Sequence, residues 1–271
     1  MRLATFDGQQ EMSTYINPIE LLGVRFDNLT TAEAADRIEE FICDGQPRRI
    51  LARNASIRVM EDRDPWLRHV YQTSDLVTVD GMAFLYLGKI LGSGFKEMTG
   101  GPALWYEMLR RASIMGYRVF LLGAAADTLE RASARLKQQY RGLQIVGWQH
   151  GFFHPDEEDR IVRDIQRSQP HILMVGMSPP MKEKFLERNL LRMGVPACIG
   201  IGGAIDLFAG QSRLAPMWMR KLCLEWLYRV YQEPQRLATR YLVSNARFLV
   251  LVVKHLFRHG DDSSLNPSST N

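Results

Sequence analysis

The sequence is poor in the features that mark a secreted, metal-binding or membrane-spanning protein. It contains only three cysteines, Cys43, Cys198 and Cys223, and their spacing matches no metal site. Two of them lie in apolar runs, which predicts buried thiols in a reducing compartment. Residues 1–17 carry no apolar core of a signal peptide. No run of about 18 apolar residues predicts a transmembrane helix.

Common catalytic signatures are scarce as well. No HExxH motif is present and the histidines form no ligand cluster, so no metal is expected. No Ser-His-Asp or Cys-His set can be identified by motif. The turn at residues 123–127 lacks the GxGxxG pattern of dinucleotide-binding proteins. A dinucleotide-dependent oxidoreductase is therefore a remote alternative.

Length and composition are those of a globular protein, but the charge is uneven. The 271 residues suffice for one large α/β domain or a domain with an appendage, and the 46% hydrophobic content is ordinary. Residues 211–260 hold nine lysines and arginines against two acids, a net +7, which leaves −3 for the rest of a chain with a total of +4. The basic charge therefore indicates a partner that meets the C-terminal fifth of the chain.

Apolar strand patterns alternate with helical patterns along most of the chain. Strands are predicted at residues 19–26, 49–53, 76–79, 117–122, 143–148, 172–176 and 197–201. Helices are predicted at residues 31–43, 54–72, 82–91, 102–115, 128–140, 155 onward and 180–193. This alternation is typical of right-handed βαβ units, so we predict an α/β fold with a mainly parallel sheet.

The chain divides into four segments by composition. Residues 1–17 are polar and predicted to be flexible, and residues 18–210 form the predicted α/β core. Residues 211–259 show only helical patterns, near 216–232 and 234–258, and form a predicted C-terminal appendage. Residues 260–271 are polar and predicted to be disordered.

The last predicted helix combines a basic stripe with a wide apolar surface. Arg236, Arg240, Arg247, Lys254 and Arg258 fall on one narrow stripe of a helical projection, and apolar residues cover most of the remaining circumference. Such a helix suits an anionic membrane surface or a lipid phosphate. The alternative is a helix packed in the core whose long cationic side chains reach water.

One stretch places a carboxylate where open α/β sheets bind their ligands. Residues 76–79 form a short apolar run typical of a buried strand, and Asp80 follows at its carboxyl end. Gly81 lets the chain turn there and lets a ligand approach the backbone. Asp80 is therefore a candidate functional residue, and capping of the next helix is the alternative.

Three further turns after predicted strands are candidate ligand contacts. Gly123 opens a turn that could hold a nucleotide diphosphate at a helix N-terminus. Gly202 and Gly203 precede Asp206 in a glycine-rich segment that indicates both a tight turn and close approach of a ligand. His150 follows a strand end and could bind a sugar hydroxyl or phosphate, although a structural role is commoner for a lone histidine.

Several motifs, taken in order, resemble those of the WecG/TagA/CpsF glycosyltransferases, family 26. They are VDG at 79–81, TGG at 99–101, FLLG at 120–123, IVGWQHGFF at 145–153, ILMVGMSPP at 172–180 with Glu183, IGGAIDLFAG at 201–210, AP at 215–216 and LEWLYRVYQEPQR at 224–236. They cover roughly residues 20–240. The resemblance implies a Rossmann-like core with helices on both faces of the sheet. It also implies a helical C-terminal appendage that brings the enzyme to the membrane.

The same resemblance implies an activity and its partners. The enzyme would transfer a sugar, with inversion, from a UDP-sugar to an undecaprenyl-diphosphate-linked saccharide in surface polysaccharide synthesis. No metal and no other cofactor is implied. The protein would be cytoplasmic and peripheral at the inner face of the cell membrane, held to anionic lipid by the appendage. No nucleic-acid partner is implied, and a homo-oligomer is left open.

By position, Asp80 matches the proposed catalytic aspartate of the family, and Asn54 matches an asparagine near the acceptor. Arg229, Arg236 and Arg240 match appendage arginines thought to hold the diphosphate. The remaining candidate substrate-binding residues are Gly81, Thr99, Gly100, Gly123, His150, Lys182, Gly202, Gly203 and Asp206.

The sequence departs from the family pattern at four positions. Ala52 replaces a threonine, and Lys182 replaces a glutamine. The arginine expected shortly before the TGG motif is replaced at about Glu97. Leu214 replaces another arginine, with Arg213 alongside. Some of these positions are expected to touch donor or acceptor, which predicts a different sugar pair or a weakened enzyme. The alternative is a non-catalytic relative that binds a nucleotide-sugar or lipid-linked glycan within a polysaccharide assembly complex.

Overall fold

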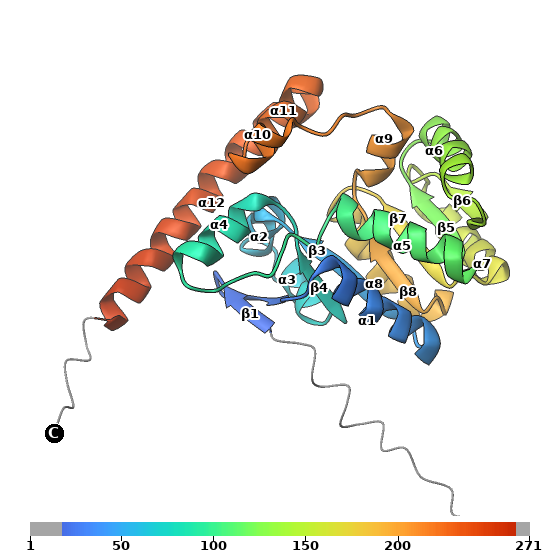
Figure 1. The fold of residues 1–271 in the computed structure, drawn as a ribbon, viewed down its shortest axis with the longest axis horizontal. Helices are drawn as coiled ribbons and strands as arrows, with labels where there is room; N and C mark the ends of the chain where they lie inside the picture. Colours follow the sequence, from blue (N-terminus) through green and yellow to red (C-terminus); the bar gives the residue numbers. More distant parts are fainter. Residues whose placement is uncertain (1–17, 264–271) are drawn as a thin grey trace, which may run out of the picture.

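The computed structural model describes residues 18–263, and its centre is a six-stranded parallel sheet (Figure 1). The strands lie in the order β4-β3-β8-β7-β5-β6, and each neighbouring pair is parallel. Their bounds are Arg48–Arg53 (β3), Leu76–Val79 (β4), Arg118–Gly123 (β5), Gln144–Gln149 (β6), Ile172–Gly176 (β7) and Ala197–Gly200 (β8). The predicted α/β class with a mainly parallel sheet is confirmed.

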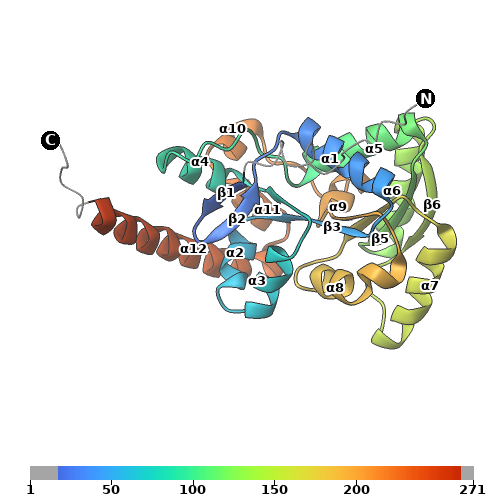
Figure 2. The same ribbon diagram turned by 90° about the horizontal axis from the view of Figure 1, so that it is seen from below.

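Helices cover both faces of this sheet, so the protein has two main hydrophobic cores (Figure 2). One face carries α1 (Thr31–Asp44), α5 (Pro102–Met115), α6 (Ala126–Gln139) and α9 (Ala204–Ala209). The other carries α2 (Ala55–Glu61), α3 (Pro65–Gln72), α7 (Glu158–Ser168), preceded by η1 (Pro155–Glu157), and α8 (Met181–Met193). Ile172 and Met174 of β7 enter the first core, whereas Leu173 and Val175 enter the second. This alternation is the period of two expected for a strand buried on both sides.

Two predicted elements near the N-terminus are wrong, and local turn chemistry explains both. The expected single strand at residues 19–26 is a hairpin of β1 (Pro18–Leu21) and β2 (Val24–Asp27), because Leu22 and Gly23 both adopt positive φ, 54° and 67°. The expected helix at residues 54–72 is two helices. Asp64 caps α3 through its carboxylate, and Pro65 occupies the first helical position.

The hairpin belongs to a third, smaller hydrophobic cluster. Phe26 packs against Phe84 of α4 (Met82–Ile90), with ring centroids 4.8 Å apart. The Asp27 carboxylate accepts a hydrogen bond of 2.7 Å from the backbone nitrogen of Val77 in β4. The hairpin therefore packs beside β4 and covers this edge strand of the sheet.

Three helices follow the core: α10 (Met217–Lys221), α11 (Glu225–Gln232) and α12 (Pro234–Ser263). The helix predicted at residues 216–232 is interrupted at Cys223, whose φ is 59°. The long helix α12 packs on α2 and α11 (Figure 1), and Phe248 contacts Phe84 at 5.3 Å. It also runs four residues into the tail that was predicted to be disordered from residue 260. Residues 1–17 and 264–271, predicted to be flexible, lie outside the described residues.

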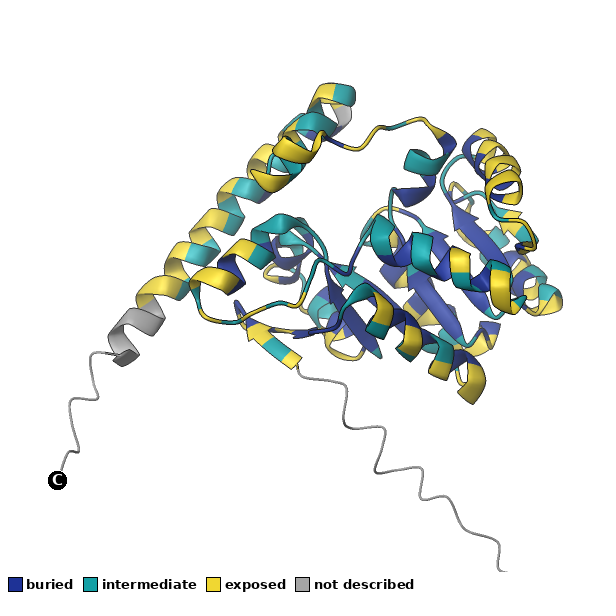
Figure 3. Cartoon of the chain, viewed as in Figure 1, coloured by how far each residue is buried: buried dark blue, intermediate teal, exposed yellow. Residues whose placement is uncertain are grey.

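Many residues of α12 are exposed (Figure 3), and several of them are large and apolar. Leu242, Leu249 and Phe257 are 61%, 63% and 75% exposed, while Phe248 and Val252 pack toward the hairpin cluster. The wide apolar surface predicted for this helix is thus divided between two faces. Among the described helices, none combines the length and apolar character needed to cross a membrane.

Candidate active site

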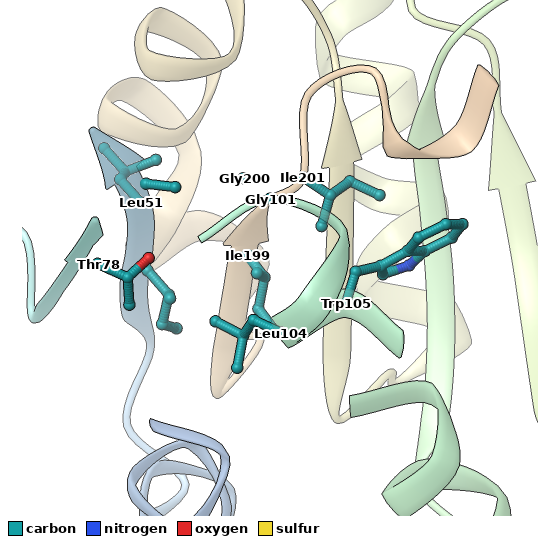
Figure 4. Close-up of a pocket in the computed structure, with 10 residues that line it drawn as sticks. Leu51, Thr78, Gly101, Leu104, Trp105, Ile199, Gly200 and Ile201 are labelled. Atoms are coloured by element: carbon teal, nitrogen blue, oxygen red, sulfur yellow. The ribbon is translucent and has the colours of Figure 1, made fainter. Parts of the chain in front are cut away.

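The parallel strands diverge at the centre of the sheet and open a crevice. β3 pairs with β8 only from Arg48 to Ile50, and beyond that point it pairs with β4 alone. The chain leaves β3 toward β4, and β8 is reached from β7 on the other side. Ligands of open α/β sheets bind outside the strand ends at such a change of direction. Figure 4 shows the small cavity between the diverging strands, lined by Thr78 and Leu51 on one side and Ile199 and Ile201 on the other.

Asp80 lies at the end of β4, at the rim of this crevice. Its backbone nitrogen donates to the Arg53 carbonyl at 2.9 Å, which continues the pairing of β3 and β4. A loop folds directly onto the aspartate, and the nitrogen of Gly100 donates to the Val79 carbonyl at 2.7 Å. A Cβ at Gly100 would lie 2.7 Å from the Cβ of Asp80, and one at Gly101 would lie 2.8 Å from its Oδ1. The two glycines are therefore needed for the loop to seat against the carboxylate.

The surroundings of Asp80 make it a partly desolvated carboxylate with cations nearby. Burial raises the pKa of Asp80, because the ionised form loses hydration. The positive charges of Arg229 and Lys182, a hydrogen bond from Asn54 and one from the Gly81 nitrogen all oppose this rise in pKa without cancelling it. A carboxylate with a raised pKa is a stronger proton acceptor than one in water, as a general base requires.

Asn54 follows β3 and has two hydrogen bonds. Its Oδ1 accepts from the backbone nitrogen of Ile57 at 3.0 Å and caps α2. Its Nδ2 faces the Oδ2 of Asp80 at 3.5 Å. The two strand ends are thus linked through side chains as well as through the backbone.

Lys182 lies beneath the crevice, at the start of α8. Its side chain crosses Gly200, where a Cβ would lie 3.1 Å from the lysine Cε. Its ammonium group pairs with Glu183, which is fully buried and also accepts from the Tyr71 hydroxyl at 3.0 Å. Burial and the neighbouring Glu183 hold the pKa of Tyr71 well above its usual value, so the phenol is a neutral donor. The ion pair with Glu183 therefore holds the Lys182 ammonium group on one side of the site.

Arg229 of α11 brings the C-terminal helices to the same place. A Cβ at Gly203 would lie 3.7 Å from the arginine Nη1 and 3.5 Å from the Oδ2 of Asp206. Burial opposes the charge of Arg229, but Tyr241, Glu225 and Asp80 outweigh it and hold the pKa of the guanidinium above its usual value. Arg229 therefore stays charged beside the turn that follows β8.

The structure thus gathers most of the predicted site residues around one crevice. Those brought together are Asp80, Asn54, Gly81, Gly100, Lys182, Gly202, Gly203, Asp206 and Arg229. Sequence reasoning missed three others: Gly101, Tyr71 and Tyr241. The TGG motif contained a signal for Gly101, whereas no local pattern pointed to either tyrosine.

Other predicted residues lie apart from Asp80 or are engaged elsewhere. Thr99 is fully buried and its hydroxyl donates to the Leu29 carbonyl, so this hydroxyl is committed within the core. Gly123 packs on Gly176, where a Cβ would lie 2.6 Å from the backbone. His150 follows β6, at the sheet edge opposite β4, and its buried Nδ1 has no hydrogen-bond partner among the described residues.

Arg236 and Arg240 lie in the first turns of α12, and their side chains are outside the described residues. No group of three or more His, Cys, Asp or Glu side chains within the described part of the chain is arranged to hold a metal ion.

The positions that depart from the family pattern have different surroundings. Ala52 lines the small cavity in register with Thr78, whose buried hydroxyl has no hydrogen-bond partner within the described chain. Glu97 accepts a hydrogen bond from the backbone nitrogen of Thr31 at the start of α1. The backbone of Arg213 exchanges hydrogen bonds with the Gln232 side chain at 2.7 and 3.0 Å. Ala52 and Lys182, described above, are therefore the departing positions that lie at the crevice.

The fold and the site together define a Rossmann-like α/β protein with a carboxylate between cations at the sheet's central crevice. Residues 19–262 match the model of the Glycosyl transferase WecG/TagA/CpsF family. The chain belongs to this family, which confirms the predicted resemblance and the expectation of a glycosyltransferase.

The chain is also similar to individual members of this family. A Bacillus spizizenii protein is 26% identical over 76% of this chain and 79% of its own length, and a Staphylococcus aureus protein is 27% identical over 81% and 86%. A Bacillus subtilis protein is 26% identical over 72% and 74%. All three are named N-acetylglucosaminyldiphosphoundecaprenol N-acetyl-beta-D-mannosaminyltransferase.

Proposed function

We propose that this protein transfers a sugar, with inversion, from a UDP-sugar to an undecaprenyl-diphosphate-linked saccharide. The observation that carries the proposal is the position of Asp80, a carboxylate of raised pKa at the crevice with Arg229 and Lys182 nearby. The names of the similar proteins support a lipid-diphosphate acceptor and an N-acetylhexosamine donor.

In the proposed reaction Asp80 is the general base. One of its carboxylate oxygens takes the proton from an acceptor hydroxyl while the oxygen of that hydroxyl attacks the anomeric carbon of the donor. The bond from the anomeric carbon to the diphosphate breaks on the opposite face, so the configuration inverts and UDP leaves. The carboxylate keeps the proton until product release returns it to water.

The leaving diphosphate needs positive charge. Arg229 and Lys182 lie close enough to Asp80 to affect its pKa, and the turn at Gly202–Gly203 can offer backbone N–H groups. We propose that these groups take the role that a divalent metal has in other transferases. Full activity in the presence of a strong chelator is expected, and activity restored only by added metal would contradict this part.

The proposed role of the C-terminal helices is to meet the membrane that holds the acceptor. α12 exposes Leu249, Val253 and Phe257, and its sequence carries the predicted basic stripe. This combination suits the interface of an anionic bilayer. Arg229, Arg236 and Arg240 would then grip the lipid diphosphate next to the core. The proposed reaction would therefore take place at a membrane surface.

The departures at Ala52 and Lys182 motivate a second candidate, a non-catalytic relative that binds a nucleotide-sugar or lipid-linked glycan. A panel of radiolabelled UDP-sugars with short polyprenyl-diphosphate saccharides separates the two. Transfer by the wild-type protein from any one donor, abolished by Asp80→Asn, is the expected result. UDP binding by calorimetry without turnover on any acceptor would favour the second candidate.

A further inference from the structure

Asn54 both caps a helix and faces the Asp80 carboxylate. It is the residue after β3 and the N-cap of α2, and its backbone is extended with φ −121° and ψ 176°. The neighbouring backbone is fixed by strand pairing, because the Asp80 nitrogen donates to the Arg53 carbonyl. The position of the Asn54 side chain relative to Asp80 is therefore set by the sheet itself.

The cap also fixes which end of the amide faces the carboxylate. The Ile57 nitrogen is a donor, so the atom that receives its 3.0 Å hydrogen bond must be the amide oxygen. The remaining amide atom is the NH₂ group, which lies 3.5 Å from the Asp80 Oδ2. A flipped amide would break the cap and turn a lone pair toward a carboxylate, so the helix selects the donor orientation.

We propose that Asn54 is a positioning residue, which orients the Asp80 carboxylate through its amide nitrogen while the start of α2 holds the amide in place. The proposal rests on Asp80 being the base in the proposed function. The amide directs one carboxylate oxygen into a fixed direction, and the other oxygen remains available for the acceptor hydroxyl.

The charged groups that face Asp80 also affect its ionisation, so the effect of Asn54 adds to theirs. Arg229 from α11 and Lys182 from α8 both favour the ionised carboxylate, and the Gly81 nitrogen donates to it. Asn54 adds a neutral donor to this set. Replacing the donor with a carboxylate should disfavour ionisation of Asp80 even though both cations remain.

The test uses variants that separate the cap from the donor. Asn54→Asp keeps a strong N-cap but places a second carboxylate beside Asp80, and the helix N-terminus favours its charged form. Asn54→Ser keeps a cap but cannot reach Asp80. Asp64→Ala is the matched control. It removes the carboxylate that caps α3 through the nitrogens of Trp66 and Leu67, at 3.1 and 3.2 Å.

The first readout is the NMR titration of the Asp80 carboxyl carbon in the full-length protein labelled at aspartate. The Asp80 signal is assigned as the one that is missing in Asp80→Asn. We expect Asn54→Asp to raise the pKa of Asp80 by about one unit or more and Asn54→Ser to raise it by less. Asp64→Ala should lower the melting temperature and leave the Asp80 titration unchanged. An Asp80 titration that is identical in wild type, Asn54→Asp and Asn54→Ser would overturn the proposal.

The second readout is the pH dependence of kcat/KM for transfer. The acid limb of Asn54→Asp should move to higher pH, so that activity is about tenfold lower than wild type at acid pH and recovers toward alkaline pH. A loss that is equal at every pH would overturn the proposal. The two failures are distinguishable, because the NMR titration needs no substrate. A shifted Asp80 titration in a protein without transferase activity would support the positioning role and refute the proposed function.

Discussion

The core and the C-terminal helices of this protein differ in where their apolar side chains lie. In residues 18–210, apolar side chains fill two cores on either side of the sheet. After residue 210, the buried side chains among the described residues are those of Ala215, Leu237 and Ser244. That short segment nevertheless holds 13 of the 21 large hydrophobic side chains that are exposed in the described part of the chain. The core therefore buries most of its apolar side chains, whereas the C-terminal helices leave many of theirs exposed.

The charge distribution divides the molecule in the same way. The C-terminal segment is strongly basic, and the remainder of the chain is slightly acidic. Arg229 belongs to the basic segment yet lies beside Gly203 and affects the pKa of Asp80. In the proposed mechanism the core therefore supplies the proton acceptor and Lys182, and the C-terminal helices supply Arg229 and the membrane contact.

The largest expected effect comes from Asp80→Asn, which tests whether a residue of the core acts as the general base. Transfer should fall by about 10²- to 10⁴-fold with and without vesicles, because the general base is lost. UDP binding by calorimetry should change little, since the side chain keeps its size. Transfer that is undiminished would remove Asp80 from the mechanism.

The same variant should not weaken the fold at neutral pH. Because burial raises the pKa of Asp80, the ionised carboxylate costs stability once the pH exceeds its unfolded value of about 4. Asn54 and both cations remain, and asparagine carries no charge. The melting temperature of Asp80→Asn should therefore equal or exceed that of wild type at pH 7 to 8, with the difference shrinking as the pH falls toward 4. A lower melting temperature at neutral pH would show that the carboxylate is structural.

Arg229→Gln comes next, because it breaks the link between the two regions. Removing this cation should lower kcat/KM by roughly 10²-fold, as loss of a group that stabilises the leaving diphosphate does. It should also raise the pKa of Asp80 further, which moves the acid limb of the pH profile upward. Arg229→Lys, which keeps the charge, should retain most of the pH profile. Equal losses in both variants with no change in pH profile would place Arg229 outside the site.

Some elements of the structure could be predicted from the sequence, and others could not. The buried strand before Asp80 and the glycines at its turn have short-range signals, so their position at the sheet rim was predictable. The hairpin at Leu22–Gly23 was missed because its turn lies inside an apolar run. The break at Asp64 was missed because its Asp-Pro signal lies between two helical patterns that were read as one helix. The Tyr71–Glu183–Lys182 cluster joins residues more than a hundred positions apart, and no local periodicity reports such a contact. The proximity of Arg229 to Asp80 was implied by the family resemblance and not by the residues themselves.

A smaller effect is expected from Leu249→Glu and Val253→Glu, which test the membrane role of the exposed face of α12. Each change removes apolar contact and adds negative charge, so partitioning onto vesicles with anionic lipid should fall about tenfold or more. Transfer to a soluble, short-chain acceptor should be unaffected. Deletion of residues 234–271 should release the protein from the same vesicles, but it also removes Phe248 from its contact with Phe84.

The control for these variants is Leu191→Glu, on an apolar side chain of the core that is 80% exposed. This variant should sediment with vesicles as wild type does. Equal losses for Leu191→Glu and Leu249→Glu would mean that net charge, and not the C-terminal surface, governs binding. Unchanged sedimentation of all variants would contradict the membrane role.

The smallest effect should come from Thr30→Ala, which affects the core alone. The Thr30 hydroxyl accepts from the Glu33 nitrogen at 3.2 Å, and the Glu33 carboxylate accepts from the Thr30 nitrogen at 2.8 Å, so the two residues form a capping box at α1. Losing one half should lower the free energy of unfolding by about 1 kcal/mol, measured by chemical denaturation. Vesicle binding and the pH profile of transfer should not change, because α1 lies on the sheet face opposite α2. A change in vesicle binding would show that the stability of the core and the docking of α12 are coupled, and the division between the two regions would fail.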